Sequence, residues 1–200
     1  MMIPHVNGLV LAGGYSTRLG LDKGLIDYYG MPHRDYLVRL IRPFTSYSWI
    51  SMRRGQQPAS TCPVLYDTFP DMGPFSGVLT AVYFDTCAAW LTVACDFPLL
   101  DAEAIRELMD ARDVNAIATC FREPDSGLPE PLLTIWEPAG GRILREAFKA
   151  GQTSMMEVLK THQVRLITPS RPEVLWNANT PEQVADMKKR IRHHQSAEAE

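Results

Sequence analysis

Two groups of residues in this sequence have the types and spacing needed to handle a phosphorylated ligand. The first is the stretch LAGGYSTRLGLDKG, residues 11–24, which follows an apolar run and places Arg18 and Lys23 among glycines. Backbone N–H groups at Gly13 and Gly14 could approach a phosphate closely, because glycine has no side chain in the way. Arg18 would bind phosphate oxygens through its planar fork and Lys23 as a point charge. The alternative is a plain turn that carries solvated charges.

Asp96 is the second candidate. It follows the apolar run AAWLTVAC and precedes Phe97 and Pro98. Magnesium prefers one or two carboxylates, several waters and phosphate oxygens, so a single aspartate suffices for a metal–triphosphate complex. A lone Asp-x-Pro reads more simply as a turn, but the pairing with residues 11–24 favours a metal role. We expect Mg²⁺ at Asp96, with Mn²⁺ as a possible substitute.

Further polar residues and glycines could line a nucleotide cleft. Asp67 ends a short predicted strand, and Gly73 and Gly77 frame the start of a predicted helix. These features fit a cleft, and equally a turn with a close helix–strand contact. Asn177 and Asn179 precede the last predicted helix and could bind a ligand through their amides, or serve as turn residues.

The standard phosphate-binding motifs are missing. The sequence contains neither G-x-x-x-x-G-K-[ST] nor G-x-G-x-x-G. The first absence excludes a P-loop NTPase, and the second weakens the case for a dinucleotide-dependent oxidoreductase. The pattern L-A-G-G-x-S-x-R-[LM]-G-x-D-K is more specific than the glycine pair alone.

The composition is that of a soluble globular domain. The 200 residues are 46% hydrophobic and 22% charged, with a net charge of −3. This length can bury a substantial core, and the mild acidity argues against a general nucleic-acid binder. The four widely spaced cysteines predict reduced thiols rather than a zinc site or disulfides. The first apolar run is too short for a membrane span and has no basic region before it, so we expect a cytoplasmic protein.

Strand and helix patterns alternate along the chain. Apolar runs predict strands at 6–12, 46–52, 63–67, 88–95, 114–121, 132–136 and 164–168. Helical spacing predicts helices at 34–44, 73–85, after Asp101, at about 139–150, at about 155–160, and after Thr180. This alternation predicts one α/β domain, residues 1–190, with a doubly wound, mostly parallel sheet and helices on both faces. Residues 191–200 read as a polar tail.

Local signals support these helix positions. Asp101 is a predicted N-cap, Ser154 and Glu157 have capping-box spacing, and Thr180 with Gln183 repeats that pattern. The helix at 73–85 is expected to bury one face made of Phe75, Val78, Leu79, Val82 and Tyr83. In open α/β sheets ligands bind beyond the carboxyl ends of the strands, where the 11–24 loop and Asp96 are both expected.

Taken in order, the motifs LAGGYSTRLGLDKG, YD…GPFSG, VACDFP, PEPL and NANTPE resemble the molybdenum cofactor guanylyltransferase family, which are MobA-like NTP transferases. The similarity covers about residues 6–188. It implies a GT-A-like, Rossmann-like nucleotide-binding fold. It also implies that molybdopterin monophosphate attacks the α-phosphorus of GTP, with release of pyrophosphate and formation of molybdopterin guanine dinucleotide.

The resemblance also implies roles for individual residues. Lys23, Arg18 and Asp96 would form the catalytic set, with Asp96 holding the metal. Asn177 and Asn179 would lie on the acceptor side. Nucleotide contacts are implied or expected at Leu11, Ala12, Gly13, Gly14, Lys23, Ser51, Asp67, Gly73, Gly77 and Asp96.

One position departs from the family pattern. The second predicted strand ends in Ser51, followed by Arg53 and Arg54, where the family typically has a nucleotide-binding asparagine. A hydroxyl offers one donor-acceptor group where an amide offers both types. Guanine is the first expectation for the base, with cytosine or another base as alternatives.

The alternatives for function follow from that departure. One is a related transferase that uses CTP or another NTP and a different acceptor, namely the cytidylyl form of the cofactor or a sugar or isoprenoid phosphate. Another is a non-catalytic nucleotide-binding relative. We expect no nucleic-acid or membrane partner. Molybdoenzymes or cofactor-biosynthesis proteins are possible protein partners, and the expected state is a monomer or weak homo-oligomer.

Overall fold

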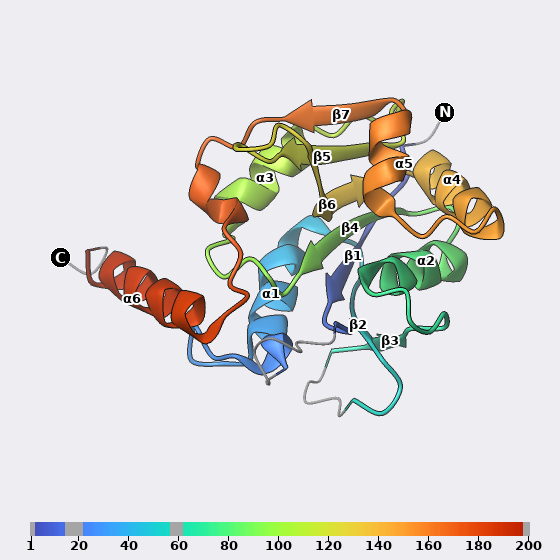
Figure 1. Ribbon diagram of the computed structural model, residues 1–200. Coiled ribbons are helices and arrows are strands. Elements are labelled where there is room, and N and C mark those ends of the chain that lie inside the picture. Colours follow the sequence, from blue (N-terminus) through green and yellow to red (C-terminus); the bar gives the residue numbers. More distant parts are fainter. Residues whose placement is uncertain (1–2, 15–21, 57–61, 198–200) are drawn as a thin grey trace.

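The computed structural model describes residues 3–14, 22–56 and 62–197, with side chains described as far as residue 193. One sheet runs through these residues in the strand order β3-β2-β1-β4-β6-β5-β7 (Figure 1). Its strands are β1 (Val6–Leu11), β2 (Ser48–Met52), β3 (Val64–Tyr66), β4 (Ala89–Ala94), β5 (Ala118–Arg122), β6 (Pro129–Trp136) and β7 (Val164–Ile167). The predicted doubly wound α/β fold is confirmed.

Strands β1 and β4 form the centre of the sheet because they are apolar on both faces. Every residue of both strands is buried, and the two strands pair in parallel from Val6↔Ala89 to Leu11↔Ala94. Strand β2 pairs in parallel on the other side of β1, with Leu11 opposite Ser51. The carboxyl ends of the three strands therefore meet at one rim, as parallel strands require.

Helices cover both faces of this sheet (Figure 1). Helices α1 (His33–Ile41) and α3 (Ala102–Asp110) lie on one face. Helices α2 (Pro74–Phe84), α4 (Pro138–Lys149) and α5 (Met155–Thr161) lie on the other. The last helix, α6 (Pro181–Ala197), lies at the lower left of the view and leads to the carboxyl terminus. The described residues also form short 3₁₀ helices, namely η1 (Lys23–Leu25), η2 (Arg42–Phe44) and η3 (Pro172–Leu175).

The parallel pattern is broken at β6. This strand runs antiparallel to both of its neighbours, β4 and β5, whereas the pairs β1–β2, β2–β3, β1–β4 and β5–β7 are parallel. The expectation of a mostly parallel sheet is thus correct. The direction of β6 could not be read from its sequence, because an apolar strand has the same pattern in either direction.

The predicted helix caps are present. The Asp101 carboxylate accepts a hydrogen bond from the Ala104 N–H at 3.0 Å, and the Ser154 hydroxyl accepts from the Glu157 N–H at 3.3 Å. Gln183 accepts from the Thr180 N–H at 3.1 Å while Thr180 accepts from the Gln183 N–H at 3.3 Å, which completes a capping box. One side chain was assigned to the wrong side, since Tyr83 is 43% exposed. It lies at the rim of the face that the other four residues bury.

The cysteines are free thiols, as expected. Cys95 and Cys120 are buried, Cys62 is half-buried and Cys87 is exposed. Across residues 3–14, 22–56 and 62–197, no helix combines the length and the apolar character needed to cross a membrane.

His33 makes folding stability depend on pH. The side chain is fully buried at the start of α1, with its ring centroid 5.0 Å from that of Tyr28 and 5.9 Å from that of Tyr36. Burial lowers its pKa to about 4, and a favourable interaction with the Phe97 backbone offsets only part of this effect. The unfolded chain therefore binds a proton at higher pH than the folded chain does.

We predict that the protein loses stability as the pH falls from about 6.5 to about 4, where this histidine contributes about 3 kcal/mol to the loss. Denaturant unfolding at pH 7.5 and pH 4.5 measures the loss. His33→Phe keeps a buried ring that does not titrate, so the difference between the two pH values should shrink in this variant. An equal difference in both proteins would contradict the prediction.

Candidate functional site

The structure brings Lys23, Asp96 and Asn179 together at the rim formed by β1, β2 and β4. The Lys23 Nζ lies 2.9 Å from Asp96 Oδ2 and donates a second hydrogen bond, at 2.5 Å, to Asn179 Oδ1. Lys23 belongs to η1 after the first strand, Asp96 follows β4, and Asn179 precedes α6. Three segments that are far apart in sequence thus place a cation, a carboxylate and an amide in direct contact.

Local interactions hold each of the three residues in place. Asp22 caps η1 by accepting a hydrogen bond from the Gly24 N–H at 2.9 Å, which fixes the backbone at Lys23. The Ala178 N–H donates to the Asp96 backbone carbonyl at 3.1 Å, so the segment before α6 is tied directly to the end of β4. Asn177, the other predicted acceptor-side residue, is exposed and directly precedes Ala178, the donor of this hydrogen bond.

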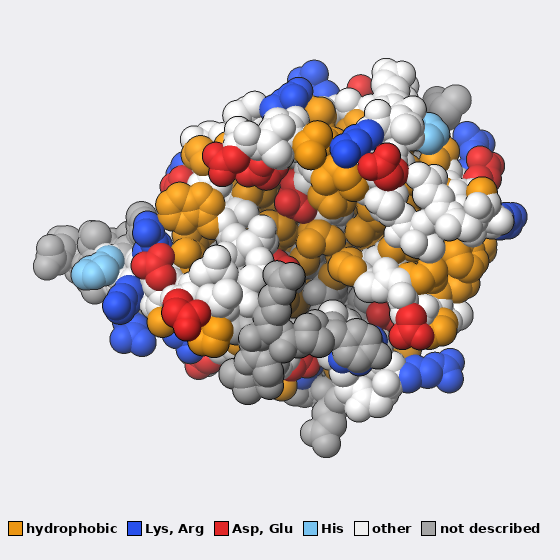
Figure 2. Space-filling model, in the orientation of Figure 1, with side chains coloured by type: hydrophobic (Ala, Val, Ile, Leu, Met, Phe, Trp, Pro, Cys, Tyr) orange, Lys and Arg blue, Asp and Glu red, His pale blue; other side chains and the backbone are white. Residues whose placement is uncertain are grey.

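Lys23 and Asp96 line a pocket of about 370 Å³, called here the Lys23 pocket, and Asn179 contacts Lys23 without belonging to the lining. Asp22, Lys23 and Asp96 supply its charged groups, and Leu11, Ala12 and Gly14 contribute from the end of β1 and the loop after it. The side chains of Lys23 and Asp96 are 18% and 26% exposed, so a ligand could reach both of them. Figure 2 shows hydrophobic side chains gathered in the middle of this face of the molecule, with acidic side chains among them.

A second pocket of about 340 Å³ adjoins it, called here the Asp67 pocket. Gly13, Arg53 and Asp67 line it, and Gly73 lines both pockets. Gly73 has a φ of 54°, a conformation that favours glycine, directly before the first residue of α2. The two pockets share Gly73 in their linings, so a ligand that extends past this glycine could contact Lys23 and Asp96 in one pocket and Asp67 in the other.

Asp67 is held between Ser51 and the loop after β1. The Ser51 hydroxyl donates to Asp67 Oδ1 at 2.6 Å. A Cβ atom at Gly13 would lie only 2.6 Å from Asp67 Oδ2, so the close approach of the loop to this carboxylate requires glycine. Burial raises the pKa of Asp67, while the Ser51 hydrogen bond and the charge of Arg53 lower it.

Ser51 and Gly77 lie beneath the pockets rather than on their surfaces. Ser51, a predicted nucleotide contact, is 1% exposed. Gly77 is buried in α2, where a Cβ would overlap the Ser51 hydroxyl and lie 2.9 Å from Leu11 Cδ2. Of the two interpretations left open for Gly77, the structure therefore supports the close helix–strand contact.

Sequence reasoning missed Gln56, which shapes the loop, and it noted Arg53 only as a neighbour of Ser51. Gln56 donates to the Ala12 carbonyl and to Asp22 Oδ2, each at 3.1 Å. Arg53 Nε donates to the Gly13 carbonyl at 2.5 Å. Gln56 matches no sequence motif, and only folding brings its side chain to the loop, where it meets Asp22, the aspartate of the pattern L-A-G-G-x-S-x-R-[LM]-G-x-D-K. Arg18 lies outside the described residues.

The donor set fits a divalent ion that is shared with a ligand. Asp96 offers a hard carboxylate oxygen in the Lys23 pocket, and Asp22 lines the same pocket. Magnesium commonly takes one or two carboxylates and fills its remaining positions with water and phosphate oxygens. Among the described residues, no group of three or more His, Cys, Asp or Glu side chains could hold a metal by itself. Any ion bound here would depend on the ligand for part of its coordination.

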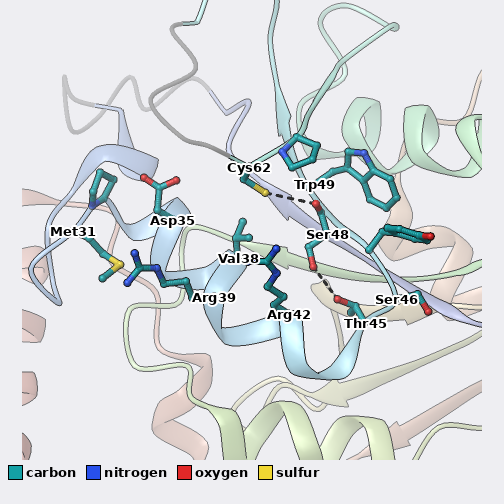
Figure 3. Close-up of a pocket in the computed structure, with 13 residues that line it drawn as sticks. Met31, Asp35, Val38, Arg39, Arg42, Thr45, Ser46, Ser48, Trp49 and Cys62 are labelled. Atoms are coloured by element: carbon teal, nitrogen blue, oxygen red, sulfur yellow. Dashed lines mark hydrogen bonds between the residues drawn. The ribbon is translucent and has the colours of Figure 1, made fainter.

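A different hollow, of about 610 Å³, lies between α1 and the start of β2 (Figure 3). Figure 3 shows Arg39 and Arg42 on the helix side, and Thr45 and Cys62 joined to Ser48 by hydrogen bonds. None of the predicted site residues lines it. Its position away from the rim separates it from the site described above.

Comparisons of the sequence with known proteins give a consistent result. The family model described as a MobA-like NTP transferase domain matches residues 8–185. A molybdenum cofactor guanylyltransferase of Pseudomonas putida is 30% identical over 189 residues, which cover 92% of this chain and 98% of that protein. A molybdenum cofactor biosynthesis bifunctional protein of Synechocystis is 33% identical over 178 residues, which are 88% of this chain but only 51% of the relative.

Solved structures share the fold at low sequence identity. The molybdopterin-guanine dinucleotide biosynthesis protein A of Archaeoglobus fulgidus superposes with a TM-score of 0.78 at 18% identity, over 94% of this chain and 99% of that one. The 2-C-methyl-D-erythritol 4-phosphate cytidylyltransferase of Thermus thermophilus gives a TM-score of 0.66 at 10% identity, over 95% and 100% of the two chains.

Proposed function

This chain belongs to the family of MobA-like NTP transferase domains, and on that premise we propose that it is a molybdenum cofactor guanylyltransferase. In the proposed reaction it transfers GMP from GTP to the terminal phosphate of molybdopterin and releases pyrophosphate. The observation that carries the proposal is the convergence of Lys23, Asp96 and Asn179 at one rim beyond the carboxyl ends of the strands. Ligands of open α/β sheets bind at this position.

The chemistry requires no nucleophile from the protein. An oxygen of the molybdopterin phosphate forms a bond to the α-phosphorus of GTP, and the bond from that phosphorus to the α–β bridging oxygen breaks. The electron pair leaves with pyrophosphate, and the acceptor oxygen is already anionic. The protein's contribution is therefore to align the two phosphates and to neutralise charge at the transferring phosphorus.

In this proposal Lys23 provides the cationic group that contacts the triphosphate. In this structure Asp96 and Asn179 hold its ammonium at the rim, and the Asp96 carboxylate balances its charge. A triphosphate in the Lys23 pocket offers this ammonium stronger anionic partners. The backbone at Leu11, Ala12, Gly13 and Gly14 would lie along the nucleotide. Arg18 stays a predicted member of the catalytic set.

Asp96, with Asp22 nearby, would hold the Mg²⁺ or Mn²⁺ that accompanies the nucleotide. A bound divalent ion would supply charge neutralisation for the triphosphate oxygens. Asn179, and Asn177 beside it, would face the acceptor phosphate. The asparagine amides can donate to phosphate oxygens without adding a charge.

The choice of guanine is supported by Asp67. This carboxylate lines the adjoining pocket, and while it is ionised it accepts hydrogen bonds and donates none. The Watson–Crick edge of guanine presents two neighbouring donors, the N1–H and the 2-amino group, whereas the ring nitrogens of adenine and cytosine at that edge are acceptors. A carboxylate at this place in the site therefore favours guanine over adenine and cytosine, and guanine offers it two donors where uracil offers one.

A nucleotide panel tests this assignment. Thermal unfolding with GTP, CTP, ATP and UTP at equal concentration, each with Mg²⁺, should give the largest stabilisation with GTP. Stabilisation follows RT ln(1 + [L]/Kd) and reaches about 2.7 kcal/mol at a hundredfold excess over Kd. Pyrophosphate release with GTP and molybdopterin is the second measurement.

Different results would point to the remaining alternatives. A larger effect of CTP, with pyrophosphate release from CTP, would identify a cytidylyltransferase. Stabilisation by GTP without any pyrophosphate release in the presence of molybdopterin would favour a non-catalytic binding protein. Residence in the cytoplasm, contacts with molybdoenzymes or cofactor-biosynthesis proteins, and a monomeric or weakly oligomeric state remain predictions.

A further inference from the structure

Ser51 occupies an unusual position for a small polar residue. It lies in β2, opposite Leu11 of β1 and Leu65 of β3, and is 1% exposed. Its backbone carbonyl accepts a hydrogen bond from the Ala12 N–H at 3.0 Å. Its hydroxyl donates to Asp67 Oδ1 at 2.6 Å. One residue thus links the first turn of the glycine loop to the carboxylate that follows β3.

Packing leaves the Ser51 hydroxyl no route to a ligand. Helix α2 crosses directly above it at Gly77, so closely that a Cβ on that glycine would overlap the hydroxyl. Neither the Lys23 pocket nor the Asp67 pocket includes Ser51 in its lining. Any effect of this hydroxyl on a bound nucleotide must therefore pass through Asp67.

We propose that Ser51 is a positioning residue for the donor nucleotide, which orients the Asp67 carboxylate so that it can accept hydrogen bonds from the base. The inference rests on the proposed function. It assigns to this chain an indirect way of recognising the base at the position where the family pattern has a nucleotide-binding asparagine.

The surroundings of Asp67 show why its orientation matters. Oδ1 is held by Ser51, and Oδ2 lies against the backbone of Gly13, so the carboxylate is fixed from two sides. Arg53, anchored to the Gly13 carbonyl at 2.5 Å, adds a positive charge nearby. With the Ser51 bond removed, only the contact with Gly13 and the charge of Arg53 would remain, and the carboxylate could turn about its own axis.

The ionisation of Asp67 matters for the same recognition. Burial raises its pKa, and the hydrogen bond from Ser51 and the charge of Arg53 are the two interactions that lower it. A protonated Asp67 would carry an O–H donor where guanine also presents donors. Loss of the Ser51 bond should raise the pKa of Asp67, so binding should begin to fail at a higher pH.

The test compares Ser51→Ala with wild type and with Ser48→Ala in equilibrium titrations with GTP and Mg²⁺ across pH 5 to 8. Ser48 is a matched control, because it lies on the same strand and its hydroxyl bonds to Thr45 at 2.8 Å, away from the site. A hydrogen bond to a charged group justifies an expected loss of GTP affinity of about tenfold or more for Ser51→Ala at pH 7. The acid limb of its binding curve should move to higher pH, with kcat much less affected than KM.

A double-mutant cycle separates this role from a purely structural one. If Ser51 acts through Asp67, then Ser51→Ala made in an Asp67→Asn background should change the GTP affinity by less than about twofold. Ser51→Cys, which keeps a weaker donor on a slightly larger side chain, replaces alanine if that variant unfolds.

Two results would overturn the proposal: wild-type affinity and pH dependence in Ser51→Ala, or a full additional loss in the Asp67→Asn background. These outcomes are distinct from failure of the proposed function. A wild-type protein that binds no nucleotide would contradict the guanylyltransferase assignment itself and this inference with it. If the wild-type protein binds GTP and Ser51→Ala binds it with the same affinity and pH dependence, only the inference about Ser51 is contradicted.

Discussion

Asp96→Ala should lower turnover by at least about a hundredfold while the protein stays folded. The variant removes the carboxylate that would hold the divalent ion and that keeps the Lys23 ammonium at the rim, 2.9 Å away. Removing one preorganised electrostatic group from an active site costs roughly 3–4 kcal/mol, or about a hundred- to thousandfold in rate. Pyrophosphate release at saturating GTP and molybdopterin measures the loss.

The fold should tolerate this change because the side chain of Asp96 is 26% exposed and supports little packing. The backbone hydrogen bond from the Ala178 N–H to the Asp96 carbonyl does not depend on the side chain and survives in the variant. Thermal unfolding checks this expectation. Asp186→Ala is a suitable control, since that carboxylate pairs with Arg190 on the exposed surface of α6.

A second measurement addresses the metal directly. Titration with Mn²⁺ in the presence of GTP should show weaker binding to Asp96→Ala than to wild type, whatever the activity. Turnover within a few fold of wild type would remove Asp96 from the catalytic set. Unchanged Mn²⁺ affinity combined with low turnover would assign Asp96 a role other than holding the ion.

Lys23→Ala should also lose at least about a hundredfold in turnover, for a different reason. Its ammonium is the cation that the structure places in the pocket next to Asp96, and it is only 18% exposed, so water screens its charge incompletely. The same range of roughly 3–4 kcal/mol applies to a cation directed at the charge that develops on the transferring phosphate. GTP affinity should fall as well, because a lysine that contacts the triphosphate acts before and during the reaction.

The two variants should differ in metal binding. Lys23→Ala leaves the Asp96 carboxylate in place and removes a competing cation, so at GTP concentrations that saturate both proteins it should bind Mn²⁺ at least as well as wild type does. Lys160→Ala provides the control, because that lysine pairs with Glu157 at 3.4 Å on an exposed surface and should leave turnover unchanged. Near-normal turnover in Lys23→Ala would refute its assigned role, even if Asp96→Ala were inactive.

Much of the fold could be predicted from local sequence patterns. The runs that became β1 and β4 are apolar at every position, which is typical of central strands covered on both faces. Asp101, Ser154 and Thr180 marked three helix starts, because an N-cap side chain bonds to a backbone N–H only two or three residues away. Such signals act over a few residues and do not depend on the rest of the chain.

The positions of the candidate site residues were partly predictable for a similar reason. The glycine loop and Asp96 each follow an apolar strand, and parallel neighbours must end at the same rim. The proximity of Lys23 and Asp96 therefore follows from topology once β1 and β4 are known to pair. The resemblance to a known family added the expected roles.

The contacts within the site were decided only by the tertiary structure. Lys23 meets Asn179 across 156 residues, and Ser51 meets Asp67 across 16, although no sequence pattern pairs them. From the sequence, Gly77 could either line a cleft or allow a close helix–strand contact. The crossing of α2 over β2 shows that it allows the close contact. The sequence alone determined which segments become strands and helices, since periodicity and capping are local. Which side chains face one another depends on strand direction, register and helix packing, and these are settled by contacts between distant segments when the chain folds.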